Sequence, residues 1–208
     1  EENFIMEKVE NIERVSVTEQ MKKKSIVREY VEAIIIALIL ALIIRTFVVQ
    51  AFKIPSGSMI PTLQIGDHIL VNKFIYRFTD IKSGDIIVFK FPKDESRDFI
   101  KRVVGLPGNK IEIKDRRVYI NDKLTDENYA FHEEEGGSSY HPRDNFGPIT
   151  VPENKFFVMG DNRENSMDSR FWGFLDKSKV KGKAFIIYWS WDKANFGIRW
   201  NRLGMMLR

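Results

Sequence analysis

Two serines lie in a short segment that holds two prolines and a glycine, Ile54-Pro55-Ser56-Gly57-Ser58-Met59-Ile60-Pro61. Proline and glycine interrupt helices and strand pairing, so we expect a rigid, extended turn that displays the serines. A serine hydroxyl is a weak nucleophile unless a base removes its proton, and nearby donors can stabilise the oxyanion that follows attack. Taken alone, the segment is better explained as a turn in which serines act as turn formers.

A second segment supplies a candidate base, because Lys101 and Arg102 are adjacent within the apolar stretch 99–104. Neighbours in a strand point to opposite faces, so one of the two cations is forced toward the apolar side. A desolvated lysine loses its proton more readily and can act as a general base, whereas arginine stays protonated. Lys101 is therefore the candidate base and Arg102 a structural residue. An edge strand with both cations in solvent explains this segment equally well.

A third segment, residues 159–173 with the sequence MGDNRENSMDSRFWG, is dense in side chains that hydrogen-bond to the backbone. It follows an apolar strand, so we expect an ordered loop. Its acidic and basic residues can form ion pairs that hold it: Asp161, Arg163, Asp168 and Arg170. A charged surface loop is the alternative.

Short β-strands must position these three segments. Runs rich in Ile, Val, Phe and Tyr, bounded by Gly, Pro, Asp and Asn, predict strands at 67–72, 85–91, 99–104, 110–114, 117–120, 155–159 and 182–189. Asp115-Arg116 is typical of a tight hairpin. Strands do not alternate with helices, which argues against a parallel sheet and favours a mainly β, antiparallel catalytic domain. Polar, glycine-rich residues at 122–150 indicate a small β insertion at the surface, spanning about 108–152.

An unbroken apolar run occupies residues 33–44. A membrane span needs roughly 20 residues, and residues 30–49 supply them if Glu32 lies at one interface and Arg45 reaches the other. The run lacks the polar face of a soluble amphipathic helix, and no small-x-small site follows it as in a cleaved signal peptide. We predict one transmembrane helix at 29–50, between a cytoplasmic tail at 1–28 and an extracytoplasmic domain at 51–208.

Positive charge before the run sets the predicted orientation. Lysines 22–24 and Arg28 precede it, and positive residues stay cytoplasmic, so residues from about 50 onward lie outside. Arg45, Glu29 and Glu32 weaken this bias without reversing it.

Composition excludes several classes of protein. The chain of 208 residues is 43% hydrophobic and 12% aromatic, which is enough to build a core. Its net charge of +4 is spread out, so nucleic acid is not expected as a partner. Cysteine is absent, which excludes disulfides and thiolate catalysis. No phosphate-binding or dinucleotide-binding motif occurs.

The three histidines offer weaker sites. A Ser-His-Asp triad needs a positioned histidine, but His132 and His141 lie in the insertion, and His68 follows Asp67 in a strand. A metal site from His132, Glu133, Glu135 and His141 is conceivable, but an acidic, solvated loop explains them better. We therefore expect neither a metal nor another cofactor.

In this order, after an apolar N-terminal segment, PSGSMIPTL, IKRVVGLPG and GDNRENSMDSRFWG resemble bacterial type I signal peptidases. The resemblance covers the apolar segment and most of residues 50–107 and 153–185. It implies an antiparallel β fold at the surface of the plasma membrane. It further implies an endopeptidase that removes N-terminal signal peptides from exported preproteins after a small-x-small sequence, alongside the protein export machinery and the membrane lipid.

The resemblance also implies residue roles. Ser58 is the nucleophile and Lys101 the general base, while the backbone N–H of Ser58 and the hydroxyl of Ser56 form the oxyanion hole. Ser166 orients Lys101. Three residues support the loop, and Gly160 also matches the pattern: Asp161, Asp168 and Arg170. Five residues fall where the family lines its small substrate pockets: Phe52, Ile54, Pro55, Met59 and Ile100.

Two rival interpretations remain open. A related Ser–Lys protease of the self-cleaving repressor type is disfavoured by the apolar segment and by the loop at 159–173. A membrane-tethered β module that binds exported chains without cleaving them is disfavoured by the intact Ser58 and Lys101.

Overall fold

The structure is a computed structural model that describes residues 2–132 and 143–207, with side chains from 5–16, 26–46 and 48 onward. The side chains of lysines 22–24, on which the predicted orientation rests, lie outside the described residues. So do Glu133, Glu135 and His141 of the alternative metal site. The chain divides into two compact units, residues 1–46 and 47–208, which are described separately.

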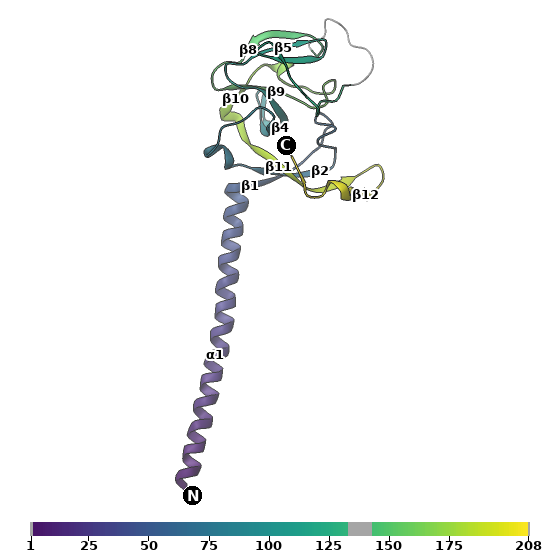
Figure 1. The fold of residues 1–208 in the computed structure, drawn as a ribbon. Helices are drawn as coiled ribbons and strands as arrows, with labels where there is room; N and C mark the ends of the chain where they lie inside the picture. Colours follow the sequence, from purple (N-terminus) through teal and green to yellow (C-terminus); the bar gives the residue numbers. More distant parts are fainter. Residues whose placement is uncertain (1, 133–142, 208) are drawn as a thin grey trace. The chain divides into compact units, whose positions relative to one another are not determined.

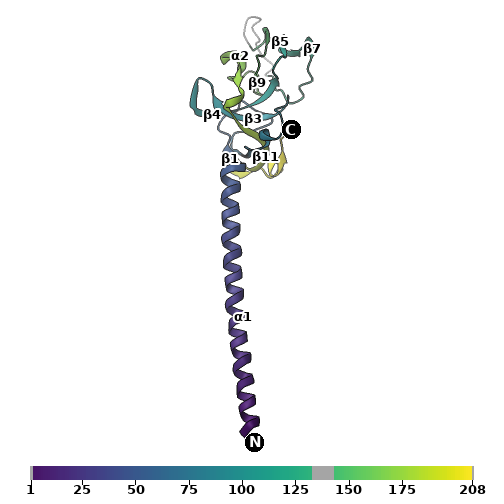
Figure 2. The same cartoon turned by 90° about the vertical axis from the view of Figure 1, so that its left-hand side faces the viewer.

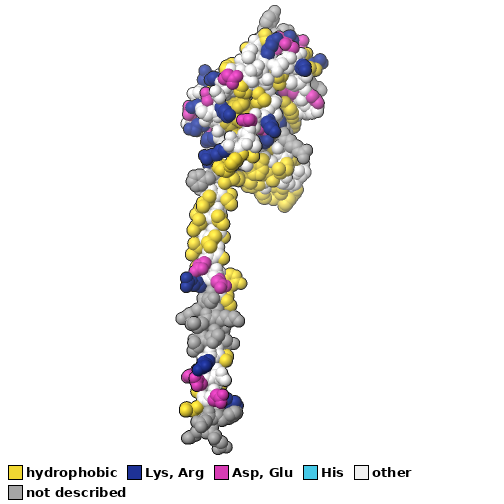
Figure 3. Space-filling view, turned by 60° about the vertical axis from the view of Figure 1, so that its left-hand side comes forward, with side chains coloured by type: hydrophobic (Ala, Val, Ile, Leu, Met, Phe, Trp, Pro, Cys, Tyr) yellow, Lys and Arg dark blue, Asp and Glu magenta, His cyan; other side chains and the backbone are white. Residues whose placement is uncertain are grey.

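The first unit is a single long helix, α1 (Glu2–Ile43), followed by a π-helical turn at Ile44–Val48. The apolar side chains at its C-terminal end are exposed, and Figure 3 shows them as an almost continuous band along the helix. No helix among the described residues combines the length and the apolar character that a membrane crossing requires.

The predicted transmembrane helix at 29–50 is wrong at its C-terminal boundary. Residues 49 and 50 begin strand β1 (Val49–Lys53), which pairs antiparallel with β2 (Asp67–Asn72), Val49 opposite Asn72. Backbone hydrogen bonds to β2 therefore replace helical ones at this point, which an apolar count along the sequence cannot detect.

The second unit is built on a nine-stranded antiparallel sheet in the order β1-β2-β11-β3-β4-β9-β10, with β12 and β13 also paired to β11. Figures 1 and 2 show it from two sides. Beyond β1 and β2, its strands are β3 (Ile86–Phe91), β4 (Asp94–Gly105), β9 (Lys155–Met159), β10 (Leu175–Asp176), β11 (Val180–Asp192), β12 (Gly197–Ile198) and β13 (Met205–Met206).

The insertion forms a second, four-stranded antiparallel sheet at the end of the domain opposite β1 and β2 (Figure 1). Its strands are β5 (Lys110–Lys114), β6 (Arg117–Ile120), β7 (Lys123–Leu124) and β8 (Phe146–Thr150). Asp115 and Arg116 both have positive φ, 47° and 67°, as a two-residue hairpin of type I′ requires. The predicted hairpin is confirmed, and so is the mainly β, antiparallel class.

Short helical turns complete the fold. Asp168 caps the N-terminus of helix α2 (Ser169–Trp172), because its carboxylate accepts a hydrogen bond from the Arg170 N–H. Three 3-10 turns lie at Ile75–Arg77, Lys177–Lys179 and Trp200–Arg202.

Strand β4 explains how the candidate base is buried. Its outer residues, from Asp94 to Asp98, are exposed, whereas Lys101 to Gly105 are buried. The buried half pairs with β3 on one side and begins to pair with β9 at Arg102. Hydrophobic clusters cover the sheet there, one holding Ile86 and Val88 and another holding Phe89 and Val103. Both faces of β4 are thus covered at the position of Lys101.

Candidate active site

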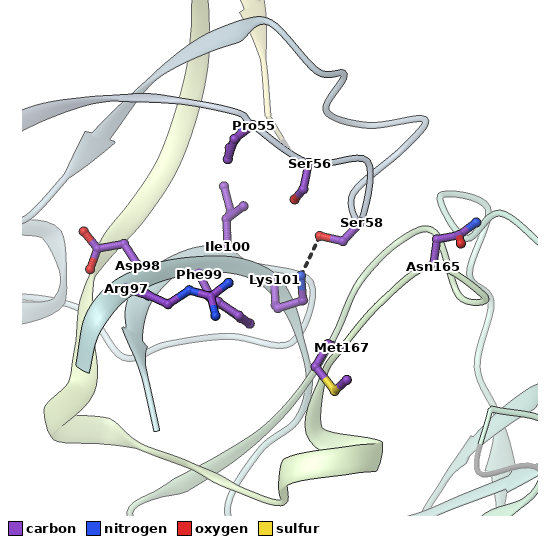
Figure 4. Close-up of a pocket in the computed structure, with 10 residues that line it drawn as sticks. All are labelled: Pro55, Ser56, Ser58, Arg97, Asp98, Phe99, Ile100, Lys101, Asn165 and Met167. Atoms are coloured by element: carbon purple, nitrogen blue, oxygen red, sulfur yellow. Dashed lines mark hydrogen bonds between the residues drawn. The ribbon is translucent and has the colours of Figure 1, made fainter. Parts of the chain in front are cut away.

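Ser58 lies on the turn that joins β1 to β2. The turn is held from below by Ile54, Met59 and Leu63, which are buried in the core, and the Ile54 N–H donates to the Asp67 carbonyl over 2.8 Å. Lys101 lies opposite, on the inner half of β4, and its Nζ is hydrogen-bonded to Ser58 Oγ at 2.6 Å (Figure 4). Two residues far apart in the sequence thus meet with the geometry of a nucleophile and its base.

The Lys101 side chain is 3% exposed, and this burial lowers the pKa of its amine to about 8. The charges of Asp168 and Asp161 oppose the change, and that of Arg170 reinforces it. Because burial penalises the ammonium form, an appreciable fraction of Lys101 is neutral near neutral pH. The amine can therefore accept a proton.

Arg102, the neighbour of Lys101, is also buried, at 2% exposure. Its Nε and Nη2 donate to the two carboxylate oxygens of Asp161 over 2.9 and 2.7 Å, and its Nη1 donates to the Gly84 carbonyl. Thr62 Oγ1 also donates to Asp161, over 2.5 Å. From the sequence, we expect one of the two cations to turn inward. Both are buried because β4 is covered on both faces, and Arg102 carries its own counter-charge.

A second buried ion pair joins Asp168 and Arg170, with Nε and Nη2 each 2.8 Å from a carboxylate oxygen. Arg170 also donates to the Arg163 carbonyl over 2.7 Å, so the pair closes the loop on itself. Burial favours a higher pKa for Asp168, but the bonds and charge of Arg170 outweigh it and hold that pKa below its usual range. Asp168 therefore stays ionised and bound to Arg170.

Ser166 is buried beside this pair, and its Oγ has no partner of hydrogen-bond geometry among the described residues. Its hydroxyl nevertheless lies close enough to Asp168 to help lower the pKa of that carboxylate, after Arg170. The structure does not bring Ser166 and Lys101 into a hydrogen bond, so the orienting role of Ser166 stays a prediction.

At residue 160 the loop approaches the backbone of Ser58 so closely that only glycine fits. A side-chain carbon added there would lie 2.4 Å from the Ser58 carbonyl oxygen and 2.4 Å from Ser166 Oγ. The neighbouring Asn162 donates two hydrogen bonds to the turn that carries Ser58, from its N–H to the Ser58 carbonyl and from Nδ2 to the Gly57 carbonyl, each over 3.2 Å. The loop at 159–173 therefore packs directly against the backbone of Ser58.

Residues 127–131 of the insertion pack against the site, a contact that the sequence does not predict. The two terminal nitrogens of the buried Arg163 each donate a hydrogen bond of 2.8 Å to the Glu127 carboxylate. Phe131 pairs with Asn162 as an isolated parallel β-bridge, and the Tyr129 ring stacks under the Arg102 guanidinium, 3.9 Å from ring centre to carbon. Two aromatic residues in an otherwise polar stretch were the only signal of this docking.

A cavity of about 520 Å³ opens beside Ser58 and Lys101 (Figure 4). Of the predicted pocket residues, Pro55 and Ile100 line it, whereas Ile54 and Met59 are buried in the core beneath and Phe52 packs against that core. The side chains of the turn settle inward because the sheet beneath them is apolar. The complete lining is Pro55, Ser56, Ser58, Arg97, Asp98, Phe99, Ile100, Lys101, Asn165 and Met167.

One side of β4 is open along this cavity. Strand β3 pairs with β4 from Asp98 to Arg102 and again at Asp94, across an irregularity at residues 95–97, but β9 pairs with β4 only from Arg102 onward. On the side away from β3, residues 94–101 therefore pair with no strand in the described part of the chain. An open edge of this kind can accept an extended peptide as an additional strand.

The described histidines lie in other surroundings. His68 Nδ1 is 3.2 Å from the Gly66 carbonyl, and His132 Nδ1 is 3.1 Å from a carboxylate oxygen of Glu164. Within the described ranges, no group of three or more acidic or histidine side chains is arranged to hold a metal ion.

The sequence of the chain matches a known protein family. The family model described as "Signal peptidase, peptidase S26" matches residues 27–189. A probable signal peptidase I-2 of Synechocystis sp. is 42% identical over 164 residues, covering 76% of this chain and 71% of the relative. Signal peptidase I of Pseudomonas aeruginosa is 35% identical over 219 residues (85% and 77%). Signal peptidase I S of Bacillus subtilis is 36% identical over 180 residues (85% and 96%).

The range matched by the family model includes the turn that carries Ser58, β4 and the loop at 159–173, the segments that meet around Ser58 in the structure. The family is membrane-associated, and its members are serine endopeptidases that remove signal peptides. The chain therefore belongs to the signal peptidase I family, peptidase S26.

Proposed function

We propose that the chain cleaves exported preproteins after a small-x-small sequence, with Ser58 as nucleophile and Lys101 as general base. The observation that carries this proposal is the hydrogen bond of 2.6 Å between Ser58 Oγ and the buried Lys101 Nζ. A buried amine with a pKa of about 8 can take the serine proton, which a lysine in water cannot do efficiently at neutral pH.

The reaction then follows from the geometry. Neutral Lys101 accepts the Ser58 proton while Oγ attacks the scissile carbonyl carbon and the carbonyl oxygen becomes an oxyanion. The Ser58 N–H and the Ser56 hydroxyl stabilise that oxyanion. The Lys101 ammonium protonates the departing amine, which leaves an ester on Ser58. Water, deprotonated by the same amine, hydrolyses the ester and restores Ser58. Ser166 supplies a buried hydroxyl that orients Lys101 once the amine is neutral.

The open edge of β4 supports the small-x-small preference. A substrate laid along residues 94–101 is extended, so alternate side chains point to the same side. Residues one and three before the cleaved bond then face one wall together, and we assign that wall to Pro55 and Ile100. Ile54, Met59 and Phe52 fill the space behind it and limit its depth. A shallow wall accepts small side chains and rejects large ones.

We further propose that the chain is a single-pass protein of the plasma membrane, with residues 1–28 cytoplasmic and the catalytic domain outside. The exposed apolar side chains of residues 34–44 support this, because a large apolar surface exposed to water is unfavourable and marks a site of interaction with a membrane or another protein. The catalytic domain also exposes Phe196 and Trp200. Membrane lipid would then be a partner, and cleavage would occur beside the export machinery, where signal peptides emerge.

The first prediction distinguishes the proposed roles of Ser58 and Ser56. Ser58→Ala should abolish cleavage of a purified preprotein, whereas Ser56→Ala should lower kcat by about 100- to 1,000-fold, as loss of one oxyanion donor does. The measurement is single-turnover cleavage by the full chain in detergent, with folding checked by circular dichroism. Equal losses in the two variants would show that the roles of the serines are misassigned.

The second prediction concerns pH. Lys101 is protonated below its pKa and inactive as a base, so kcat/KM should rise with pH and level off above about 8. Lys101→Arg should be inactive because guanidinium keeps its proton. Arg102→Lys is the matched control. It should retain this pH profile but lose stability, because lysine cannot bond Asp161 bidentately. An active Lys101→Arg variant would contradict the assignment.

The third prediction concerns orientation. Protease added to intact spheroplasts should digest residues 51–208 and spare a tag placed before residue 28, because positive flanks remain cytoplasmic. Immunoblotting of both ends gives the readout, with detergent-permeabilised cells as the control. A catalytic domain that resists protease until the cells are permeabilised would mean that the proposed topology is inverted.

A further inference from the structure

Arg97 occupies the outer end of the cavity wall. It precedes Lys101 by four residues on β4, and the Phe99 ring contacts both cations, with Lys101 Nζ 5.6 Å and the Arg97 guanidinium carbon 5.3 Å from the ring centre. The two charged groups therefore lie on the same side of the strand, at most about 11 Å apart. Figure 4 shows Arg97 and Phe99 on one side of the strand and Ile100 on the other. Arg97 and Lys101 both line the cavity.

Aromatic rings hold the Arg97 guanidinium in place. Its central carbon lies 5.3 Å from the ring centre of Phe99 and 5.9 Å from that of Phe91. These two rings stack on each other, with centroids 4.2 Å apart and planes 6° apart. Cation–π contacts of this kind fix a cation without neutralising it. The positive charge therefore stays at a defined place on the wall.

The acidic neighbours of Arg97 are engaged elsewhere. Asp98 forms an ion pair with Lys181 over 2.7 Å. Glu95 forms an ion pair with Lys179. Asp94 accepts hydrogen bonds from the N–H and the hydroxyl of Ser96, which are the main cause of its lowered pKa, and the charge of Arg97 adds less to that change. In the described part of the chain, Arg97 belongs to no ion pair within 4.0 Å. The outer end of the wall thus presents a net positive charge.

We propose that Arg97 is a specificity-determining residue that favours an acidic side chain and disfavours a basic one about four residues from the cleaved bond. The proposal rests on the proposed function, because the substrate must lie along β4. An extended chain advances by about 3.3–3.4 Å per residue, so a span of up to about 11 Å between the two charged groups corresponds to three or four substrate residues.

The test uses peptides that share one small-x-small cleavage sequence and carry Glu, Gln or Lys at a single position, three to five residues from the cleaved bond on either side. At one of these positions the wild-type chain should cleave the Glu peptide about 2- to 5-fold faster than the Lys peptide, as for an exposed charge pair. Arg97→Gln should remove this ratio and Arg97→Glu should invert it. About 1 M salt should shrink it in the wild type.

Arg77→Glu is the matched control, because Arg77 is likewise exposed, stacks on an aromatic ring (Phe74, 5.2 Å) and lies outside the cavity lining. It makes the same change in net charge and should leave the Glu-to-Lys ratio at its wild-type value. The inference is overturned if Arg97→Glu and Arg77→Glu shift the ratio equally, or if neither shifts it while the Gln peptide is still cleaved. Failure of the wild type to cleave any peptide would instead overturn the proposed function, and the inference with it.

Discussion

The site depends on burying the Lys101 amine beside two carboxylates without letting either of them pair with it. Burial lowers the pKa of Lys101, while the charges of Asp161 and Asp168 act in the opposite direction. Each carboxylate is already bound bidentately by its own arginine, Asp161 by Arg102 and Asp168 by Arg170. The arginines offset the negative charge, so desolvation decides the outcome. Without them, a buried carboxylate would hold Lys101 as an ammonium ion, which cannot act as a base.

The same loop that carries both carboxylates also fixes Ser58, the proposed nucleophile. Gly160 allows the loop to approach the Ser58 carbonyl, and Asn162 donates two hydrogen bonds to the turn that carries Ser58. Residues 127–131 of the insertion clamp the loop from outside through the Glu127–Arg163 pair and the Phe131 bridge. Charge balance and position are therefore set by one connected network, in which removal of one buried partner leaves another unsatisfied.

Local patterns predicted much of the fold, because strand alternation and turn residues act over a few positions. The apolar neighbours of Lys101 left its burial and a solvated edge strand equally open, and it was the resemblance of the segments holding Ser58 and Lys101 to a known family that singled out this pair. Strand β1 was missed because Val49 to Lys53 continue an apolar run, and only pairing with β2 makes them a strand. The Glu127–Arg163 pair was missed because its partners are 36 residues apart and Glu127 stands in a polar stretch. Contacts of that range depend on the folded chain.

The proposed mechanism depends on the protonation state of Lys101. Nitrogen-detected NMR of the lysine amines measures that state directly. The full chain in micelles would be titrated, and the Lys101 signal would be assigned by its loss in Lys101→Arg. We predict that this amine titrates with a pKa of about 8, well below that of the exposed lysines. A Lys101 amine that titrates with the exposed lysines, near the ordinary value of about 10.4, would contradict it.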